Sequence, residues 1–426
     1  MITKDDWAKV QKMTTWFDRF KFFGDVRFRF ETLYNNFDED GGLNNGVNLY
    51  LQRFRLRVGT TVTLDDFTAG LRLASGTGQQ VSTNQTESNL SSNTDLWIDQ
   101  VYLNWSGSST RWLKITMGKM PNPFYLDYTS DLMWDDDFNP EGYAEGLSFN
   151  PKPNINLFLN AAQFALNVQA NAKNTFDPIT SEIFFTGSSH APWMIGEQAG
   201  VSVESASQMK SAMAVAFYDF VNVGGRDGAP LGGTQQQGNS REMTTAAPPL
   251  PPPGTLLNNY RVLDATAMLQ TRVGTIPITF MGDYLRNLAN TTDTGYRTGT
   301  ATGNYGYQLG FIIGHAADAH SWELAYFYKL LETDATLADL VDSDFGNGGT
   351  ARRGQIMWAA YNLTKFLQFK IKYFVTTAIV PNPTPNAPVP SGCYQVVNPL
   401  DPLNNPPQTG ICGDINRLQV DVNMKF

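Results

Sequence analysis

Strict alternation of apolar and polar residues is the feature of this sequence that most constrains its fold. From Asp25 to Glu31 every even position is apolar and every odd position is charged, and Arg53 to Val58 repeats the pattern. The last ten residues, Arg417 to Phe426, alternate in the same way, with polar side chains at all odd positions. Because successive side chains of a strand point to opposite faces, this period of two predicts β-strands with one apolar and one polar face.

Segments of this kind recur about sixteen times along the chain, and many approach the ~9–11 residues of a tilted membrane-spanning strand. They cover residues 23–34, 48–64, 67–75, 95–105, 112–120, 143–150, 154–166, 193–205, 210–222, 259–273, 277–287, 305–315, 321–332, 354–363, 366–379 and 415–426. An even number of strands lets both chain ends emerge on the same side of a sheet.

The links between these segments are short and long in turn. Short links, such as residues 65–66 and 364–365, follow the even-numbered strands, and long links, such as 223–258 and 380–414, follow the odd-numbered ones. Bacterial outer-membrane barrels have short turns on one side and long loops on the other, whereas a soluble β-sandwich has no reason to keep this order. We therefore predict an all-β, transmembrane antiparallel β-barrel of about 16 strands, with short periplasmic turns and long extracellular loops.

Composition agrees with a barrel and excludes some other classes. The chain has 42% hydrophobic and only 17% charged residues, and its mean hydropathy is -0.29. No stretch reaches the ~18 apolar residues of a membrane-spanning helix, but a barrel strand turns only alternate residues to lipid. The formal net charge of -9 argues against a nucleic-acid partner.

The two ends of the chain differ from each other. Residues 1–20 carry Trp7, Val10, Met13 and Phe17 at spacings of three and four, which predicts a short amphipathic helical segment ahead of a barrel at 21–426. No apolar leader precedes it, so we interpret the chain as a processed outer-membrane protein. The terminal Phe426 continues the apolar face of its strand and resembles the signal that the outer-membrane assembly machinery recognises.

The only two cysteines, Cys393 and Cys412, fall in one long link near the C-terminus. A disulfide between them would fit an oxidising periplasm or cell surface, and two free thiols are the alternative.

Catalytic and metal-binding chemistry has little support. The three histidines, His190, His315 and His320, lie beside no convincing nucleophile and form no ligand pattern with cysteines. The glycine-rich run from Gly346 to Gly349 is better interpreted as a loop tip than as a phosphate cradle, because no P-loop pattern is present. We predict that the protein is not an enzyme and needs no metal or cofactor.

Several segments in the first third of the chain resemble the "putative porin" family of Gram-negative outer membranes. The resemblance is carried by residues 16–20, 24–31, 53–59, 81–85, 99–103, 118–124, 130–137 and 139–142. It is specific over residues 16–150; beyond them it rests on the barrel pattern and the terminal Phe. The resemblance implies a 16-stranded barrel in outer-membrane lipid, passive uptake of small hydrophilic solutes, and a homotrimer. It implies no particular solute.

Basic residues share the non-lipid face of strands that a closed barrel would bring together. Facing lipid at mid-depth costs a Lys or Arg about 2–4 kcal/mol, so these side chains should line the lumen. The predicted pore-lining basic wall consists of Arg27, Arg29, Arg53, Arg55, Arg57, Arg72, Lys370, Lys372 and Arg417.

The link after the fifth strand is acidic, and in porins the third long loop folds inward and narrows the pore. The predicted constriction loop carries Asp127, Asp131, Asp135, Asp136, Asp137 and Glu141. A solvated surface loop is the plain alternative. The chain should therefore be a passive pore for small hydrophilic solutes or ions, with a substrate-selective anion channel, for example for phosphate, as the second hypothesis. A structural or adhesive surface barrel is the third.

Overall fold

Strands make up most of the chain that the computed structural model describes. Their bounds are β1 (Phe20–Asn35), β2 (Asn48–Leu64), β3 (Phe67–Ala74), β4 (Gln85–Thr86), β5 (Trp97–Trp105), β6 (Leu113–Lys119), β7 (Glu141–Lys152), β8 (Ile155–Ala165), β9 (Lys173–Asp177), β10 (Glu182–Thr186), β11 (Trp193–Glu204), β12 (Lys210–Val221), β13 (Tyr260–Val273), β14 (Ile276–Asn287), β15 (Tyr305–Gly314), β16 (Trp322–Leu331), β17 (Arg352–Asn362), β18 (Leu367–Ala378), β19 (Cys393–Val396), β20 (Gln408–Cys412) and β21 (Asp414–Lys425). One 3-10 turn, η1 (Ala338–Leu340), lies between β16 and β17.

The structure describes the following part of the chain. The residues are 16–35, 48–87, 93–126, 130–166, 173–177, 182–186, 191–205, 209–224, 238–239, 256, 258–289, 303–346, 348–379, 393–396, 408–412 and 414–426. Of β9, β10, β19 and β20 only the backbone is described.

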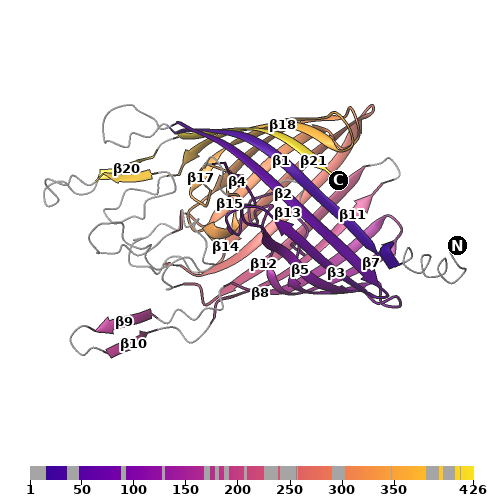
Figure 1. Cartoon of the computed structure of the whole chain (residues 1–426), viewed down its shortest axis with the longest axis horizontal. Helices are drawn as coiled ribbons and strands as arrows, with labels where there is room; N and C mark the ends of the chain where they lie inside the picture. Colours follow the sequence, from indigo (N-terminus) through magenta and orange to yellow (C-terminus); the bar gives the residue numbers. More distant parts are fainter. Residues whose placement is uncertain are drawn as a thin grey trace, which may run out of the picture.

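Sixteen of these strands close into one antiparallel barrel (Figure 1). The order around the barrel is β1, β2, β3, β5, β6, β7, β8, β11, β12, β13, β14, β15, β16, β17, β18 and β21. Pairing of β21 with β1 completes the circle. The predicted fold class is thus confirmed, and each of the sixteen predicted segments overlaps one barrel strand.

The links keep the predicted alternation of length. The turns β2–β3 and β13–β14 leave two residues between strands, whereas the link β6–β7 spans residues 120–140 and the link β16–β17 spans 332–351. In Figure 1 the C-terminus lies toward the end of the barrel where the short turns are. The hairpins β9–β10 and β19–β20 are insertions in two of the long links.

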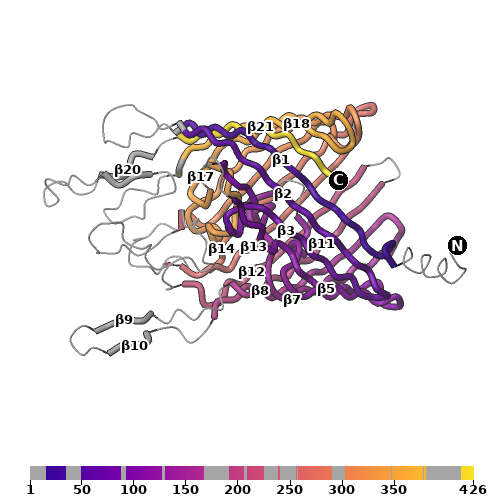
Figure 2. Tube along the Cα trace, in the orientation of Figure 1, coloured from indigo at the N-terminus to yellow at the C-terminus, as the bar shows by residue number. Residues whose placement is uncertain are grey.

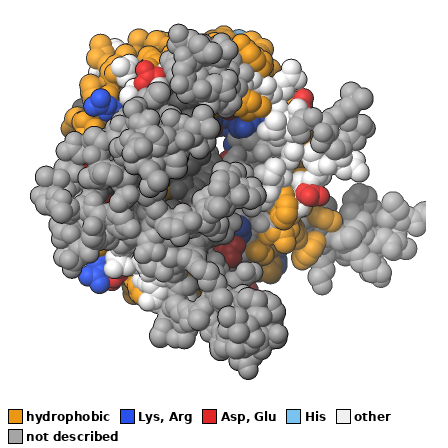
Figure 3. Space-filling model, turned by 90° about the vertical axis from the view of Figure 1, so that its left-hand side faces the viewer, with side chains coloured by type: hydrophobic (Ala, Val, Ile, Leu, Met, Phe, Trp, Pro, Cys, Tyr) orange, Lys and Arg blue, Asp and Glu red, His pale blue; other side chains and the backbone are white. Residues whose placement is uncertain are grey.

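The outer face of the barrel is apolar because it takes the apolar half of each alternating strand. Phe28, Leu159, Phe280 and Ile371 are typical, each exposing 47–58% of its surface. From the loop end, hydrophobic side chains show around the perimeter, while lysine, arginine and acidic side chains show within the opening (Figure 3). This separation is what a barrel needs when lipid surrounds it and water enters its lumen.

The C-terminal residue takes part in closing the barrel. Phe426 exchanges two backbone hydrogen bonds of 3.0 Å with Gly24 of β1. A Cβ atom on Gly24 would lie only 2.6 Å from the Phe426 ring, so a glycine leaves room for that ring.

The predicted N-terminal helical segment falls mostly outside the described residues. Among the described ones only Trp16 and Phe17 have helical backbone; Asp18 and Arg19 form a turn, and β1 begins directly afterwards at Phe20.

Candidate functional site in the barrel interior

All nine predicted wall bases lie on five neighbouring strands, β18, β21, β1, β2 and β3. The register sets Arg27 opposite Arg55 and Arg29 opposite Arg53. Parity places these side chains on the inner face, because the neighbouring Phe28 and Phe30 are exposed outside. The strands therefore bring together residues that are up to about 390 positions apart in the sequence, here called the basic arc.

Carboxylates that the sequence analysis did not single out lie within the basic arc. Asp421 accepts hydrogen bonds of 2.7 and 2.9 Å from the Arg29 guanidinium. Asp25 lies 2.8 Å from Arg55 and 2.7 Å from Arg57.

Two further carboxylates extend the same pattern. Glu31 lies 3.2 Å from Arg417 and 3.5 Å from Arg53, and Asp99 pairs with Arg72. The arc is consequently a network of ion pairs, in which most of the positive charge is neutralised.

The described part of the third long loop, residues 120–126 and 130–140, packs against the inner face of the barrel and contacts this network. Asp137 lies 3.4 Å from Arg57 and 3.7 Å from Arg55. It also accepts two hydrogen bonds of 3.1 Å from the backbone and hydroxyl groups of Thr83. Although burial alone would raise the pKa of Asp137, the facing Arg55 and Arg57 hold that pKa below its usual 3.8.

Two neighbouring carboxyl groups of the same loop have raised pKa values instead. Burial, together with the nearby Asp137 and Asp342, raises the pKa of Asp135 well above its usual value. Burial and the charges of Asp136 and Asp342 raise the pKa of Asp131 in the same direction. Asp135 still accepts two backbone hydrogen bonds, 2.8 Å from Asp137 and 2.9 Å from Ser343. Its role is therefore to hold loop backbone together.

The remaining predicted loop acids lie in different surroundings. Asp136 is exposed, between the two engaged carboxylates. Asp127 lies outside the described residues. Glu141 does not join the loop acids: it is the first residue of β7, shares the outer face with Tyr143 and pairs with Lys119 at 3.2 Å. Glu141 is two residues before Tyr143 in the same strand, and alternate residues of a strand face the same side, so Glu141 faces outward.

A second long link, which was not predicted from the sequence, also lies inside the barrel. Residues 332–351, between β16 and β17, are almost all buried, and their trace stays within the outline of the barrel (Figure 2). Asp344 pairs with Arg417 at 2.7 Å and with Arg29 at 3.0 Å. Those two arginines hold the pKa of Asp344 well below its usual value, against the effect of burial.

The two inner loops also bind each other. The backbone NH of Asp135 donates to the carbonyl of Leu340 at 2.7 Å. Lys329 of β16 lies 3.6 Å from Asp342 and donates to the carbonyl of Asp131 at 2.9 Å. The glycine-rich run, interpreted from the sequence as a loop tip, belongs to this buried link: the carbonyl of Gly346 accepts from Arg417 at 2.7 Å.

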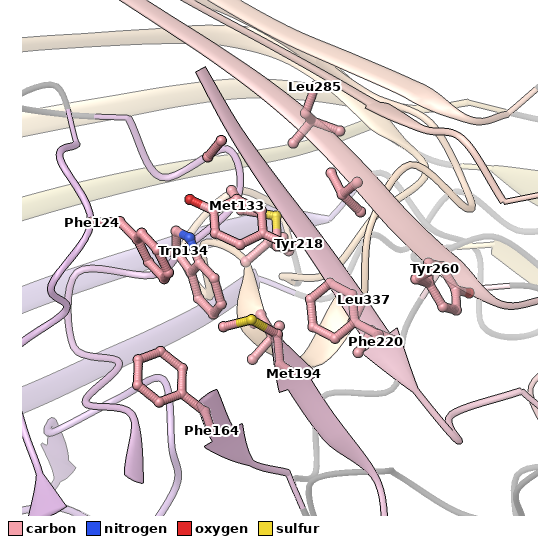
Figure 4. Packing of buried hydrophobic residues seen from close by; sticks show 14 of the residues in the cluster. Phe124, Met133, Trp134, Phe164, Met194, Tyr218, Phe220, Tyr260, Leu285 and Leu337 are labelled. Carbon is pink, nitrogen blue, oxygen red and sulfur yellow. The ribbon is translucent and has the colours of Figure 1, made fainter. Parts of the chain in front are cut away.

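Opposite the basic arc, the inner face of the barrel is apolar. Phe164, Met194, Tyr218 and Tyr260 point inward from β8, β11, β12 and β13 and are almost completely buried. Figure 4 shows these side chains around Trp134 and Phe124 of the third loop and Leu337 of the β16–β17 link. The Trp134 ring packs edge-on against Tyr218, with 5.3 Å between ring centroids. Both loops therefore rest on a packed apolar cluster.

Cys393 and Cys412 are direct partners in the register of β19 and β20, so the backbone is compatible with the predicted disulfide. His190 lies outside the described residues. Within the part of the chain that the structure describes, no cluster of three potential metal ligands occurs. Among the same residues, no helix is long and apolar enough to cross a membrane.

Comparison with known proteins decides the family. The family described as "Putative porin" matches residues 35–255 and 239–426, which is nearly the whole chain. The chain belongs to this porin family. A comparison with curated protein sequences gives no match.

One solved structure, with a TM-score above 0.5, shows the same fold as this porin, and two others are similar to it at lower scores. OprB of Pseudomonas putida, in a high-pH structure, matches with a TM-score of 0.53 at 10% identity, over 99% of this chain and 97% of that one. OmpF of Salmonella typhi, in a complex with daunomycin, gives a TM-score of 0.47 at 11% identity, over 96% and 97% of the two chains. A Rh. blastica porin variant gives 0.42 at 11% identity, over 96% and 100%. Family and fold point to an outer-membrane diffusion channel rather than to an enzyme.

Proposed function

We propose that this porin is a passive channel for small hydrophilic solutes and ions, narrowed by its third loop. The main support for the proposal is the pairing of Asp137 with Arg55 and Arg57, because this contact holds the acidic loop against the basic wall inside the lumen. Fixed charges of both signs in a narrow water-filled passage favour solutes that keep their hydration or replace it by polar contacts. Such a passage needs no solute-specific site.

The alternative is a substrate-selective anion channel, for example for phosphate, that uses the basic wall as a binding ladder. The ion pairs within the basic arc argue for the general channel, because a paired arginine is less available to a passing anion. Liposome swelling with sugars of graded size separates the two. A general channel admits sugars by size alone, whereas uptake of phosphate that saturates while small sugars are excluded would contradict the proposal.

We further propose that the porin is a homotrimer that buries one polar patch of its outer wall. Glu145 of β7 and Glu197 of β11 both face outward, on either side of Ala161 in β8. Among the described residues neither carboxylate has a base within ion-pair distance. A hollow of about 440 Å³ lies between them. Small residues at such a hollow let a second chain approach closely.

Charge complementarity also favours a second copy as the occupant of this patch. The outer face of the same chain carries two exposed arginines, Arg286 of β14 and Arg353 of β17, without a carboxylate partner among the described residues. Cysteines replacing both Ala161 and Arg353 in the same chain should form cross-links between copies, because the β8 patch of one copy would face β17 of the next. Replacing both glutamates by Gln should weaken the oligomer seen on unheated gels. A cysteine replacing Leu418, on the outer face of β21, is the control. Cross-linking there and none at position 161 would refute this contact.

Phe426 and the cysteine pair complete the proposal. Phe426 would be the end that the assembly machinery recognises, so deleting it should lower the yield of folded, heat-modifiable barrel in the outer membrane. A Phe426→Tyr variant, which keeps an aromatic end, should assemble normally. The Cys393–Cys412 disulfide would shift the mobility of an unreduced peptide fragment that spans both cysteines, and an unchanged mobility on reduction would exclude it.

A further inference from the structure

Most charges of the basic arc are already used within the protein. Each of its arginines except Arg27 has a carboxylate within ion-pair distance. Arg27 donates a hydrogen bond to the Asn84 side chain instead. Lys370 and Lys372 have no carboxylate at ion-pair distance in the described part of the chain. Only these bases can offer charge to a solute without first breaking an internal pair.

The two lysines form a pair of their own on β18. They occupy successive inward positions of the strand, which places their Cα atoms about 6–7 Å apart. The Lys370 ammonium lies 4.6 Å from the ring centre of Trp358, and the Lys372 ammonium lies 4.6 Å from that of Phe374. Both lysines remain partly accessible to solvent. Cation–π contacts of this kind hold an ammonium in place and leave its donors free on the other side.

Asp136 is the matching free charge of the third loop. Its neighbours Asp135 and Asp137 are engaged in the hydrogen bonds and ion pairs described above, whereas Asp136 is exposed and has no ion-pair partner among the described residues. Among the described residues, a carboxylate on the loop and two ammonium groups on the wall are therefore left without an ion-pair partner.

We propose that Lys370 and Lys372 form an anion subsite in the passage, and that the unpaired carboxylate of Asp136 on the third loop weakens it. Its ligands would be small anions, such as chloride or a short carboxylate. The two ammonium groups outweigh the single carboxylate, so the passage should favour anions, and Asp136 should limit how long an anion stays. The inference rests on the proposed function, because a subsite in a passage requires that the barrel conducts. It narrows the predicted nine-residue basic wall to its two lysines on β18.

Planar-bilayer recordings of the purified full-length protein in a potassium chloride gradient test the subsite. The double variant Lys370→Gln, Lys372→Gln should lower the chloride-to-potassium permeability ratio roughly threefold to fivefold. This factor corresponds to the interaction of one unit charge with an ion at contact distance in water. Asp136→Asn should raise the ratio. Both shifts should shrink as the salt concentration rises, because salt screens charges in water.

Lys114→Gln provides the matched control. Lys114 is exposed on the inner face of β6, far along the strand from the inner loops, so this variant removes the same charge from another part of the lumen. Heat-modifiable mobility on gels establishes that each variant is folded. If the double lysine variant conducts but shifts the ratio no more than Lys114→Gln, the subsite is refuted while the channel stands. If the unaltered protein does not conduct at all, the proposed function fails and the subsite fails with it.

Discussion

On one side of the barrel interior, β8, β11, β12 and β13 turn large apolar side chains toward the inner loops, whereas on the other side β21, β1 and β2 turn arginines and carboxylates toward them. Each inner loop touches both walls. The third loop places Trp134 in the apolar cluster and Asp137 on the arginines. The β16–β17 link does the same with Leu340 and Asp344.

The two walls stabilise the inner loops in different ways. Apolar packing is not directional and supplies most of the free energy that holds a segment in place. Ion pairs and charge-assisted hydrogen bonds demand a particular geometry and therefore fix which way a loop presents its charges. We infer that the apolar wall keeps the loops inside the barrel and that the charged wall determines the field of the remaining passage.

Trp134→Ala should have the largest effect, because it removes the centre of the apolar contact. Truncating a buried aromatic side chain costs about 3–5 kcal/mol, and here that cost falls on the seating of the third loop. We expect higher single-channel conductance with large fluctuations, and a lower temperature of heat modification. Phe280→Ala, on the outer face of β14, is the control and should leave conductance unchanged. Equal effects from both variants would show that the two walls do not differ as proposed.

Asp137→Asn should have a smaller effect on the same loop. The amide keeps the shape of the side chain and one acceptor for Thr83, but it leaves Arg55 and Arg57 with less compensation. Unsatisfied buried groups of this kind cost about 1–3 kcal/mol. The loop should stay inside, so we expect conductance close to that of the unaltered protein and a shift of reversal potential toward anions. An increase in conductance as large as that of Trp134→Ala would mean that the ion pairs, and not the packing, hold the loop.

The charged wall could be predicted from the sequence, because alternation is local and parity assigns each side chain to a face. Strand order around a closed barrel then follows from chain order, which is why the predicted bases lie on adjacent strands. Which carboxylate pairs with which base could not be predicted. The contact between Asp344 and Arg29 joins residues 315 positions apart, and no local pattern marks it.

The apolar wall left a signal in the sequence that the analysis did not use. From Ala212 to Phe220 nearly every residue of β12 is apolar, at inward as well as outward positions. A continuous apolar run means a strand that is buried on both faces, so an inner face of this kind needs something to cover it. The glycines from Gly346 to Gly349 suggested an external loop tip, but packing of Leu337 and Leu340 against the apolar wall overrides that local preference.

Acid should release the two inner loops from the charged wall only at low pH. The pKa of Asp137 and that of Asp344 lie below the usual value, so their contribution to stability is complete above that value and is lost as the pH falls through the lowered pKa. Acid has the opposite effect at Asp135, whose pKa is raised: protonating this buried carboxyl removes a destabilising charge, so the folded state gains stability as the pH falls through that pKa. The rise in conductance that marks release of the loops should therefore occur only below about pH 4, because protonation of Asp135 above that pH stabilises the folded loop. A rise centred near pH 6 would show that Asp137 and Asp344 do not control the loops.

The smallest effect should come from Glu141→Gln, and it separates the inner charges from an outer one. Glu141 and Lys119 pair at 3.2 Å, as Asp137 and Arg57 do at 3.4 Å, yet Glu141 leaves 64% of its side chain exposed on the outer rim, against 11% for Asp137. Exposed pairs contribute less than about 1 kcal/mol, because water screens them and ordering two long side chains costs entropy. We expect no measurable change in conductance, reversal potential or heat modification. A shift in reversal potential as large as that of Asp137→Asn would place Glu141 in the passage after all, and the outward position of β7's first residue would be wrong.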